Sequence, residues 1–207
     1  MKTKVVNSVI NYLQKTNKYS KSNLARYRYS AEALYSLLTK MGTVMIIAII
    51  FKLVKPTLWL LLFYTIIRMS GFGIHASKNI YCWIITLSVY IITPILIINS
   101  RFDNIFYYLL IPMIISIIVF CPADTPKRPL IHKSKRTLNK ILIIITCLSY
   151  LFLTYKINSK IIKYSIFYAI TIQFIVSNPL VYKLFGIPFN NYKKYKSPNN
   201  LIDSKEV

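Results

Sequence analysis

One histidine and one cysteine in this 207-residue chain are spaced so that they could do chemistry together. Cys82 lies seven residues after His75, within residues 68–83, a polar, glycine-bearing segment between two strongly apolar runs. An imidazole beside a thiol can take the thiol proton and leave a thiolate nucleophile. If a helix starts near Ser77 or Asn79, Cys82 falls in its first turns, where the helix dipole favours the thiolate. The spacing therefore suggests Cys82 as a nucleophile and His75 as its general base.

Neighbouring residues of the same segment are candidates for binding a substrate. The amides at Gly71 and Gly73, or those of the helix start at Ser77, could hold an oxyanion, because glycine lets the backbone approach a substrate closely. Arg68 is a charge at the edge of an apolar run and could clamp a carboxylate or a phosphate. These four residues complete the candidate site within residues 68–83.

Each candidate also has an interpretation without catalysis. Cys82 could be a small packing residue, and Arg68 could anchor the chain at the lipid headgroups. Asp124 is the one acid of a later basic loop. It could order that loop through nearby lysines, or it could orient His75.

The composition identifies the class of protein. Hydrophobic residues make up 55% of the chain and the mean hydropathy is +0.49, which predicts an integral membrane protein. Lys and Arg total 27 against 5 Asp and Glu. These positive charges lie in the tails and loops between apolar runs, a pattern that favours anionic membrane lipid over nucleic acid as a partner. The three cysteines have no CxxC spacing, and we expect no metal and no cofactor.

The apolar runs predict an all-α integral membrane protein with about four full transmembrane helices. The four predicted spans cover residues 79–98, 105–121, 141–155 and 161–176. Residues 42–67 are also apolar, but Lys52, Lys55 and Pro56 interrupt them. Each half is short for a full span, so this region forms either two short crossings or a re-entrant hairpin.

The remaining segments are amphipathic or basic. Residues 22–40 predict an interfacial helix, and residues 1–18 predict either a similar short helix or a basic tail. The predicted regions are interfacial helices over 1–40, a polytopic membrane domain over 41–180 and a basic tail over 181–207. The membrane domain would contain both the active-site segment and a basic loop over 122–140.

The distribution of charge predicts the topology. The positive-inside rule places residues 1–40, 122–140 and 181–207 in the cytoplasm. Two spans separate the active-site segment from the basic loop, so that segment also faces the cytoplasm. Residues 42–67 must then cross an even number of times, twice or not at all. The lysines at the opposite turn fit the rule less well: Lys156, Lys160 and Lys163.

With these motifs the chain resembles the accessory gene regulator protein B family, membrane cysteine endopeptidases of Gram-positive peptide quorum sensing. The resemblance rests on Arg68, on Gly-Ile-His-Ala at residues 73–76 and on Cys82. Residues 122–129, Pro-Ala-Asp-Thr-Pro-Lys-Arg-Pro, look like the family's cytoplasmic loop, and length and basicity agree along nearly the whole chain. The family often has Gly-Gly before the His-Ala pair, whereas here Ile74 follows a single glycine.

The resemblance implies a reaction and a partner. The substrate would be an AgrD-like propeptide, which loses its acidic C-terminal tail as Cys82 forms a thioester with the remainder. A Cys or Ser of the propeptide would then close a thiolactone or lactone ring. Arg68 would engage the acidic tail, and the protein would form a homodimer in the cell membrane.

Two other classes of function compete with this interpretation. A small membrane transporter or a membrane scaffold would use the apolar helices and basic loops without any thiol chemistry. The reactivity of the Cys82 thiol separates these classes from the enzyme.

Overall fold

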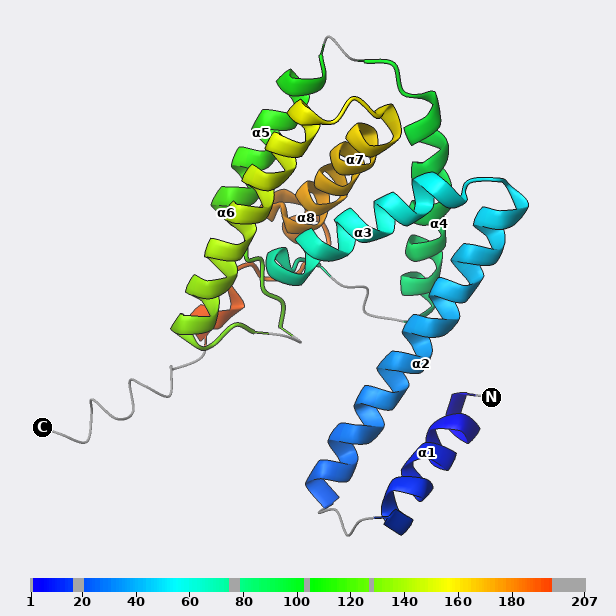
Figure 1. Cartoon of the computed structure of the whole chain (residues 1–207). Helices are drawn as coiled ribbons and strands as arrows, with labels where there is room; N and C mark the ends of the chain where they lie inside the picture. The colour runs from blue at the N-terminus through cyan, green and yellow to red at the C-terminus, as the bar shows by residue number, and fades with distance from the viewer. Residues whose placement is uncertain (1, 17–20, 75–78, 103–104, 127–128, 195–207) are drawn as a thin grey trace, which may run out of the picture. The chain divides into compact units, whose positions relative to one another are not determined.

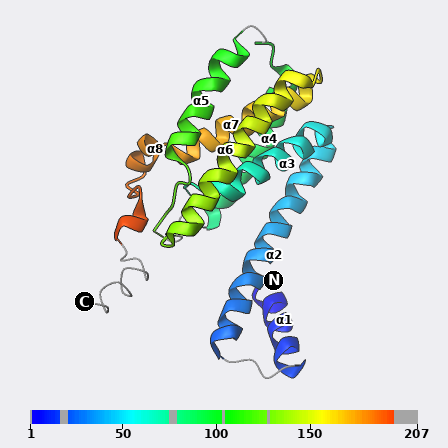
Figure 2. The ribbon, with the colours of Figure 1, turned by 60° about the vertical axis from the view of Figure 1, so that its left-hand side comes forward.

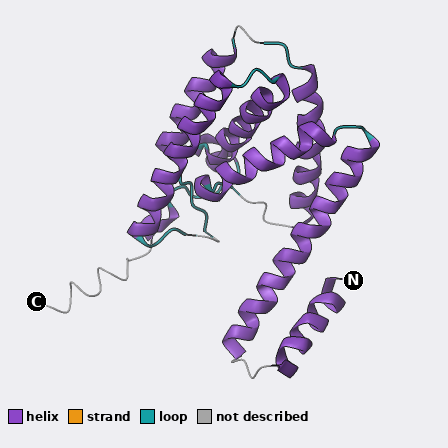
Figure 3. Ribbon diagram, in the orientation of Figure 1, coloured by secondary structure: helices purple, strands orange, loops and turns teal. Residues whose placement is uncertain are grey.

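The computed structural model describes residues 2–16, 21–74, 79–102, 105–126 and 129–194. These residues form helices and connecting loops, without a strand, which confirms the predicted all-α class (Figure 3). The helices are α1 (Lys2–Thr16), α2 (Lys21–Ile50), α3 (Val54–Gly71), α4 (Asn79–Asn99), α5 (Phe106–Phe120), α6 (Lys133–Lys156), α7 (Lys160–Ser177), α8 (Pro179–Leu184) and the 3-10 helix η1 (Asn191–Lys194). The chain divides into two compact units, residues 1–52 and 53–207.

The first unit is a pair of helices. α1 runs alongside the first half of α2 (Figures 1 and 2), and Val6 and Ile10 of α1 are buried. Arg28 of α2 donates a hydrogen bond to Asn7 Oδ1. On another part of its surface α1 leaves Val5 exposed, which is the amphipathic arrangement expected of a helix at a membrane surface.

Helix α2 joins two segments that the sequence pattern separates. The predicted interfacial helix over 22–40 continues without a break to Ile50. The residue at the join, Gly42, is not enough to end a helix, because glycine costs only about 1 kcal/mol relative to alanine there. The boundary between interfacial helix and membrane domain at residue 40 stays a prediction.

The predicted interruption of residues 42–67 is present. The chain turns at Phe51–Leu53, where Lys52 has a φ of 57°. Pro56 lies in the first turn of α3, where a missing N–H breaks no helical hydrogen bond. This region is therefore the end of one helix and most of the next.

Four helical segments are long and apolar enough to cross a membrane among the described residues, as predicted in number. They are Tyr27–Ile50, Ile80–Asn99, Lys133–Lys156 and Lys160–Ser177. Three of them coincide with predicted spans, but the predicted span over 105–121 is the 15-residue α5. This helix ends at Phe120 because the residue before Pro122 is biased away from helical backbone, and Cys121 is extended.

The surface of the second unit is apolar along its helices. Large exposed side chains include Ile84, Ile85 and Ile92 on α4, Ile111, Ile115 and Val119 on α5, and Ile141, Ile145 and Leu148 on α6. In water so much exposed apolar surface would be a liability, whereas lipid tails cover it at no cost. The surface and the span lengths together fit a multi-pass membrane protein.

Helix α7 is the centre of the second unit. It packs against α3, α4, α5, α6 and α8 (Figure 1). Its buried residues include Tyr164, Ile166 and Ile170, and also the polar Gln173. Polar side chains on this helix therefore face protein instead of lipid.

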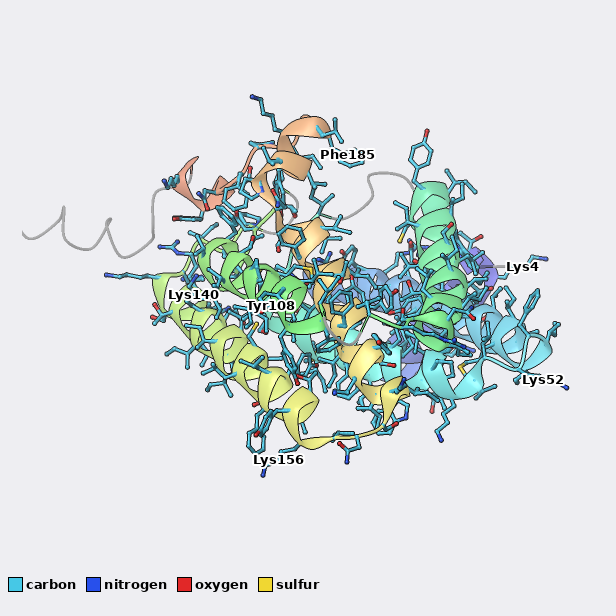
Figure 4. The ribbon with its side chains drawn as sticks, turned by 90° about the horizontal axis from the view of Figure 1, so that it is seen from above. Lys4, Lys52, Tyr108, Lys140, Lys156 and Phe185 are labelled. Carbon is cyan, nitrogen blue, oxygen red and sulfur yellow. The ribbon has the colours of Figure 1, made fainter. Side chains whose placement is uncertain are left out.

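The second unit has two distinct ends. Toward one end, Tyr168 and Tyr164 in the first half of α7 bind Ser100 Oγ and the Phe102 amide, at 2.8 and 3.2 Å. At the other end, the Ile74 amide donates to Val176 O at 2.9 Å. Figure 4 labels Lys140 and Lys156 near the two ends of α6. Residues 68–74, the start of α6 and the end of α7 thus share one end.

Helices α3 and α7 touch most closely at a glycine. A methyl group on Gly71 would lie 2.5 Å from Gln173 Nε2 and 3.3 Å from Ile143 Cδ1. The first distance is shorter than any normal contact, so a larger residue would force the Gln173 side chain out of its place. Gly42 of α2 is different, because a methyl group there would meet nothing within 4 Å.

Alanine at these two glycines should have opposite effects on stability. We expect Gly71→Ala to lower the free energy of unfolding by about 1–3 kcal/mol through overpacking. Gly42→Ala should raise it by up to about 1 kcal/mol, because alanine favours helix and the site is open. Thermal unfolding in detergent micelles, followed by circular dichroism, measures both. Equal shifts of the same sign would contradict the packing at Gly71.

Candidate functional site

Arg68 lies in the last turn of α3 and reaches over the end of its own helix. Its guanidinium donates hydrogen bonds to the carbonyl oxygens of Phe72, Gly73 and Ile74, the last at 2.8 Å. Carbonyl groups beyond a helix end have no helical partner, and a cation in the last turn satisfies them. A substrate carboxylate would have to displace these bonds, so the predicted clamp role of Arg68 stays a prediction.

Gly73 occupies a position that only glycine fits. Its φ is +116°, and a methyl group there would lie 2.5 Å from Arg68 Nη1 and 2.6 Å from Val176 O. The Gly73 amide donates to Ala123 O at 2.8 Å. Its N–H is therefore already bonded inside the protein, and the oxyanion role predicted for this glycine stays untested.

Ala123, in the loop after α5, is bonded to residues 71 and 73. Its amide donates to Gly71 O at 3.0 Å, and its carbonyl accepts from Gly73 on the same side. Tyr182 Oη of α8 donates to the same carbonyl at 3.0 Å. Burial raises the pKa of Tyr182, which keeps this phenol protonated as a donor. The peptide bond before Pro122 is cis.

Gln173 of α7 completes this cluster. Its Nε2 donates to Phe72 O at 3.0 Å and lies 3.6 Å from Cys121 Sγ, while its Oε1 has no hydrogen-bond partner among the described residues. The side chain is fully buried. The end of α3, the loop after α5 and the end of α7 therefore meet at a buried cluster of polar groups.

Cys82 is the most accessible of the three thiols. It lies in the first turn of α4, which begins at Asn79, and it is half-buried, whereas Cys121 is 2% exposed and Cys147 is fully buried. Its carbonyl accepts a hydrogen bond from Thr86 Oγ1 at 2.7 Å. The start of the helix at Asn79 agrees with one of the two predicted positions.

The other two predicted residues of this segment cannot be placed. His75 and Ser77 lie outside the described residues. The geometry of the His75–Cys82 pair is consequently open, and both catalytic roles stay predictions.

Asp124 is almost fully buried, at 1% exposure, and it is bonded to backbone. Its Oδ1 accepts from the Asn191 amide at 2.8 Å, and its Oδ2 accepts from the Tyr192 amide at 2.8 Å and the Leu130 amide at 3.4 Å. The loop is thus ordered by amide groups from two segments, where the sequence suggested lysines. Whether Asp124 also orients His75 is untested.

Several residues of this cluster were not predicted from the sequence. Gln173 carried a usable signal, because it is an amide within an apolar span, where polar side chains face the protein interior. Tyr182, Asn191 and Tyr192 carried none, since they lie in a stretch that reads as a basic tail.

Comparison with known proteins places this architecture in a family. The sequence model of the family described as Accessory gene regulator B matches residues 6–177. A protein named AgrB-like from Listeria innocua is 29% identical over 181 residues, covering 83% of this chain and 84% of the relative. An AgrB-like protein from Clostridium acetobutylicum is 24% identical over 187 residues, covering 88% and 89%.

A third relative carries the full family name. Accessory gene regulator protein B of Staphylococcus aureus is 30% identical over 122 residues, which cover 58% of this chain and 64% of the relative. No solved structure matches the chain. The match over residues 6–177 confirms the resemblance seen in the motifs, and the chain belongs to the accessory gene regulator B family.

Proposed function

We propose that this chain is a membrane-embedded cysteine endopeptidase that processes an AgrD-like propeptide into a cyclic signal for quorum sensing. Family membership supports a role in the accessory gene regulator quorum-sensing system. The observation that carries the catalytic part is the position of Cys82. Its thiol is half-buried and lies at the start of α4, at the end of the unit where residues 71–74 are held.

A second support for this site is that the backbone just before His75 is held by hydrogen bonds. Gly73 and Ile74 precede His75 in the sequence, and their amides are bonded to Ala123 O and Val176 O. Arg68 binds the carbonyl groups of the same two residues. A catalytic base needs a fixed backbone on one side at least, because small displacements of reacting groups cost large factors in rate.

The first chemical step forms a thioester. His75 takes the proton from the Cys82 thiol, and the sulfur attacks a backbone carbonyl near the C-terminal side of the propeptide. The carbon–nitrogen bond of that peptide group breaks, and the departing tail takes the proton from His75 as its new amine. Cys82 then holds the rest of the propeptide through a carbon–sulfur bond.

The second step closes the ring. A Cys or Ser side chain of the propeptide attacks the thioester carbonyl, gives its proton to His75 and releases Cys82, which is protonated again. The thioester keeps the acyl group activated, so ring closure needs no ATP. The product is a thiolactone or a lactone, and no residue of this chain is consumed.

We further propose that the catalytic end faces the cytoplasm. The active-site segment, the loop after α5 and the segment after α7 lie at the same end of the unit, as the parity of crossings requires. At the opposite end Lys156 and Lys163 lie over the rings of Phe152 and Phe106, at 6.0 and 5.8 Å. These contacts give the two lysines a local partner at that end.

The homodimer stays a prediction.

Removing the nucleophile should abolish both cleavage and the covalent intermediate. We expect Cys82→Ala to lower the rate of propeptide cleavage by at least about 10³-fold. Intact mass spectrometry of the wild-type protein with its AgrD-like propeptide in lipid should show an adduct of the propeptide without its tail, and Cys82→Ala should show none. Cys147→Ala, which removes a fully buried thiol, should keep the adduct.

An adduct that persists in Cys82→Ala would show that another residue is the nucleophile. If wild-type protein gives neither adduct nor cleavage with a confirmed propeptide, and all three thiols resist alkylation, the transporter or scaffold interpretation gains instead.

Labelling from outside the cell tests the orientation. In a Cys82→Ser background, Asn158→Cys at the α6–α7 turn should react with an impermeant maleimide on intact cells. Lys135→Cys near the start of α6 should react only after the membrane is permeabilised, because the basic end faces inward. The native Cys121 and Cys147 are buried and give the background signal. The reverse labelling pattern would place the site outside.

A further inference from the structure

A short segment after α8 packs onto the loop that carries Asp124. We call residues 188–192 the C-terminal strap. The Asp124 carboxylate accepts hydrogen bonds from two consecutive strap amides, those of Asn191 and Tyr192, both at 2.8 Å. Asn191 Nδ2 in turn donates to Asp124 O and, at 2.6 Å, to Pro188 O. Residue 124 is thus bonded through its carboxylate and its backbone.

The buried carboxylate depends on these bonds. A carboxyl group at 1% exposure needs hydrogen-bond partners inside the protein, and hydrogen bonds from backbone amides to a carboxylate are among the stronger ones. Both Asp124 oxygens already accept amide N–H groups. Of the hydrogen bonds to the Asp124 carboxylate, the two shortest come from the strap amides.

Further contacts keep the strap in place. The Arg136 guanidinium lies 3.9 Å from the centre of the Tyr192 ring and donates to Leu130 O and Ile131 O. The Phe189 ring makes an edge contact with Tyr182 at 5.1 Å. Phe185, just before the strap, points away from the unit and is 65% exposed (Figure 4).

The loop under the strap is bonded directly to the active-site segment. Ala123, next to Asp124, exchanges hydrogen bonds with Gly71 and Gly73, at 3.0 and 2.8 Å. One hydrogen bond therefore joins Tyr192 to Asp124, the chain joins Asp124 to Ala123, and a second hydrogen bond joins Ala123 to Gly73, which lies two residues before His75.

We propose that the C-terminal strap and Asp124 are positioning elements of the active site: the strap amides hold the loop over residues 121–124, and this loop holds the backbone of residues 71–73 where catalysis needs it. The inference rests on the proposed endopeptidase function. The family match ends at residue 177, so it assigns no role to the strap.

The test compares two shortened chains with a substitution at Asp124. One chain ends at Ile187 and lacks the strap, and its matched control ends at Lys194 and keeps both donor amides. Asp124→Asn is made in the full-length chain and in the chain that ends at Ile187. Each protein is assayed in lipid for the kcat and KM of propeptide cleavage and for amide hydrogen exchange at Gly73 and Ala123.

Loss of the strap and Asp124→Asn should each lower kcat by about ten- to a hundredfold, with KM within about threefold of wild type. Exchange at Gly73 and Ala123 should become faster in both. Because the two changes break the same contact, their combination should cost no more than either alone. The chain that ends at Lys194 should behave as wild type.

Two results would overturn the proposal. If Asp124→Asn lowers kcat by the same factor in the shortened chain as in the full one, Asp124 acts without the strap, directly on the catalytic base. If removing the strap changes neither exchange nor kcat, the strap positions nothing. Should the chain that ends at Ile187 fail to fold, Tyr192→Pro, which removes one donor amide, replaces it in the cycle.

The exchange measurement separates this proposal from the proposed function. Faster exchange in the variants, with no cleavage by the wild type, would keep the strap contact and reject the endopeptidase. Cleavage by the wild type with unchanged kcat in every variant would do the opposite.

Discussion

The backbone of residues 72–74 has to find hydrogen-bond partners inside the protein, and the rest of the second unit is arranged to supply them. These residues lie beyond the end of α3 in an apolar bundle, where unsatisfied N–H and C=O groups are costly. Arg68 supplies donors for the carbonyl groups, while Ala123 and Val176 accept from the amides. Satisfying one short loop therefore ties α3, the loop after α5 and α7 together.

The same constraint explains the polar residues in the middle of an apolar protein. Gln173 is buried because α7 is surrounded by other helices, so its amide can serve Phe72 without meeting lipid. Gly71 is small because that amide lies against it. The outward positions of α4, α5 and α6 carry isoleucine and leucine, which need no partner. The candidate site is therefore held in place by the surrounding helices, and the segment that contains the candidate catalytic residues is short.

The sequence pattern predicted those features of the protein that depend on local composition. Apolar runs predicted membrane-spanning helices, and of the expected interruptions Lys52 lies in the break between α2 and α3, whereas Lys55 and Pro56 lie inside α3. Motif spacing around His75 and Cys82 led to the family that the comparison confirmed. The sequence pattern did not show that α2 runs unbroken from Lys21 to Ile50, because a single glycine and a change in polarity look like a boundary but do not break helical hydrogen bonds.

By itself the sequence determined the class of protein, the helix class and the identity of the candidate nucleophile, since each depends on residue types along one segment. Only the tertiary structure decided the partners of Arg68, Asp124 and Gln173. Arg68 binds its own loop, Asp124 binds amides 67 and 68 residues further along, and Gln173 binds a carbonyl 101 residues earlier. The backbone partners of these side chains leave no mark on composition, because every residue except proline offers the same N–H and every residue the same carbonyl.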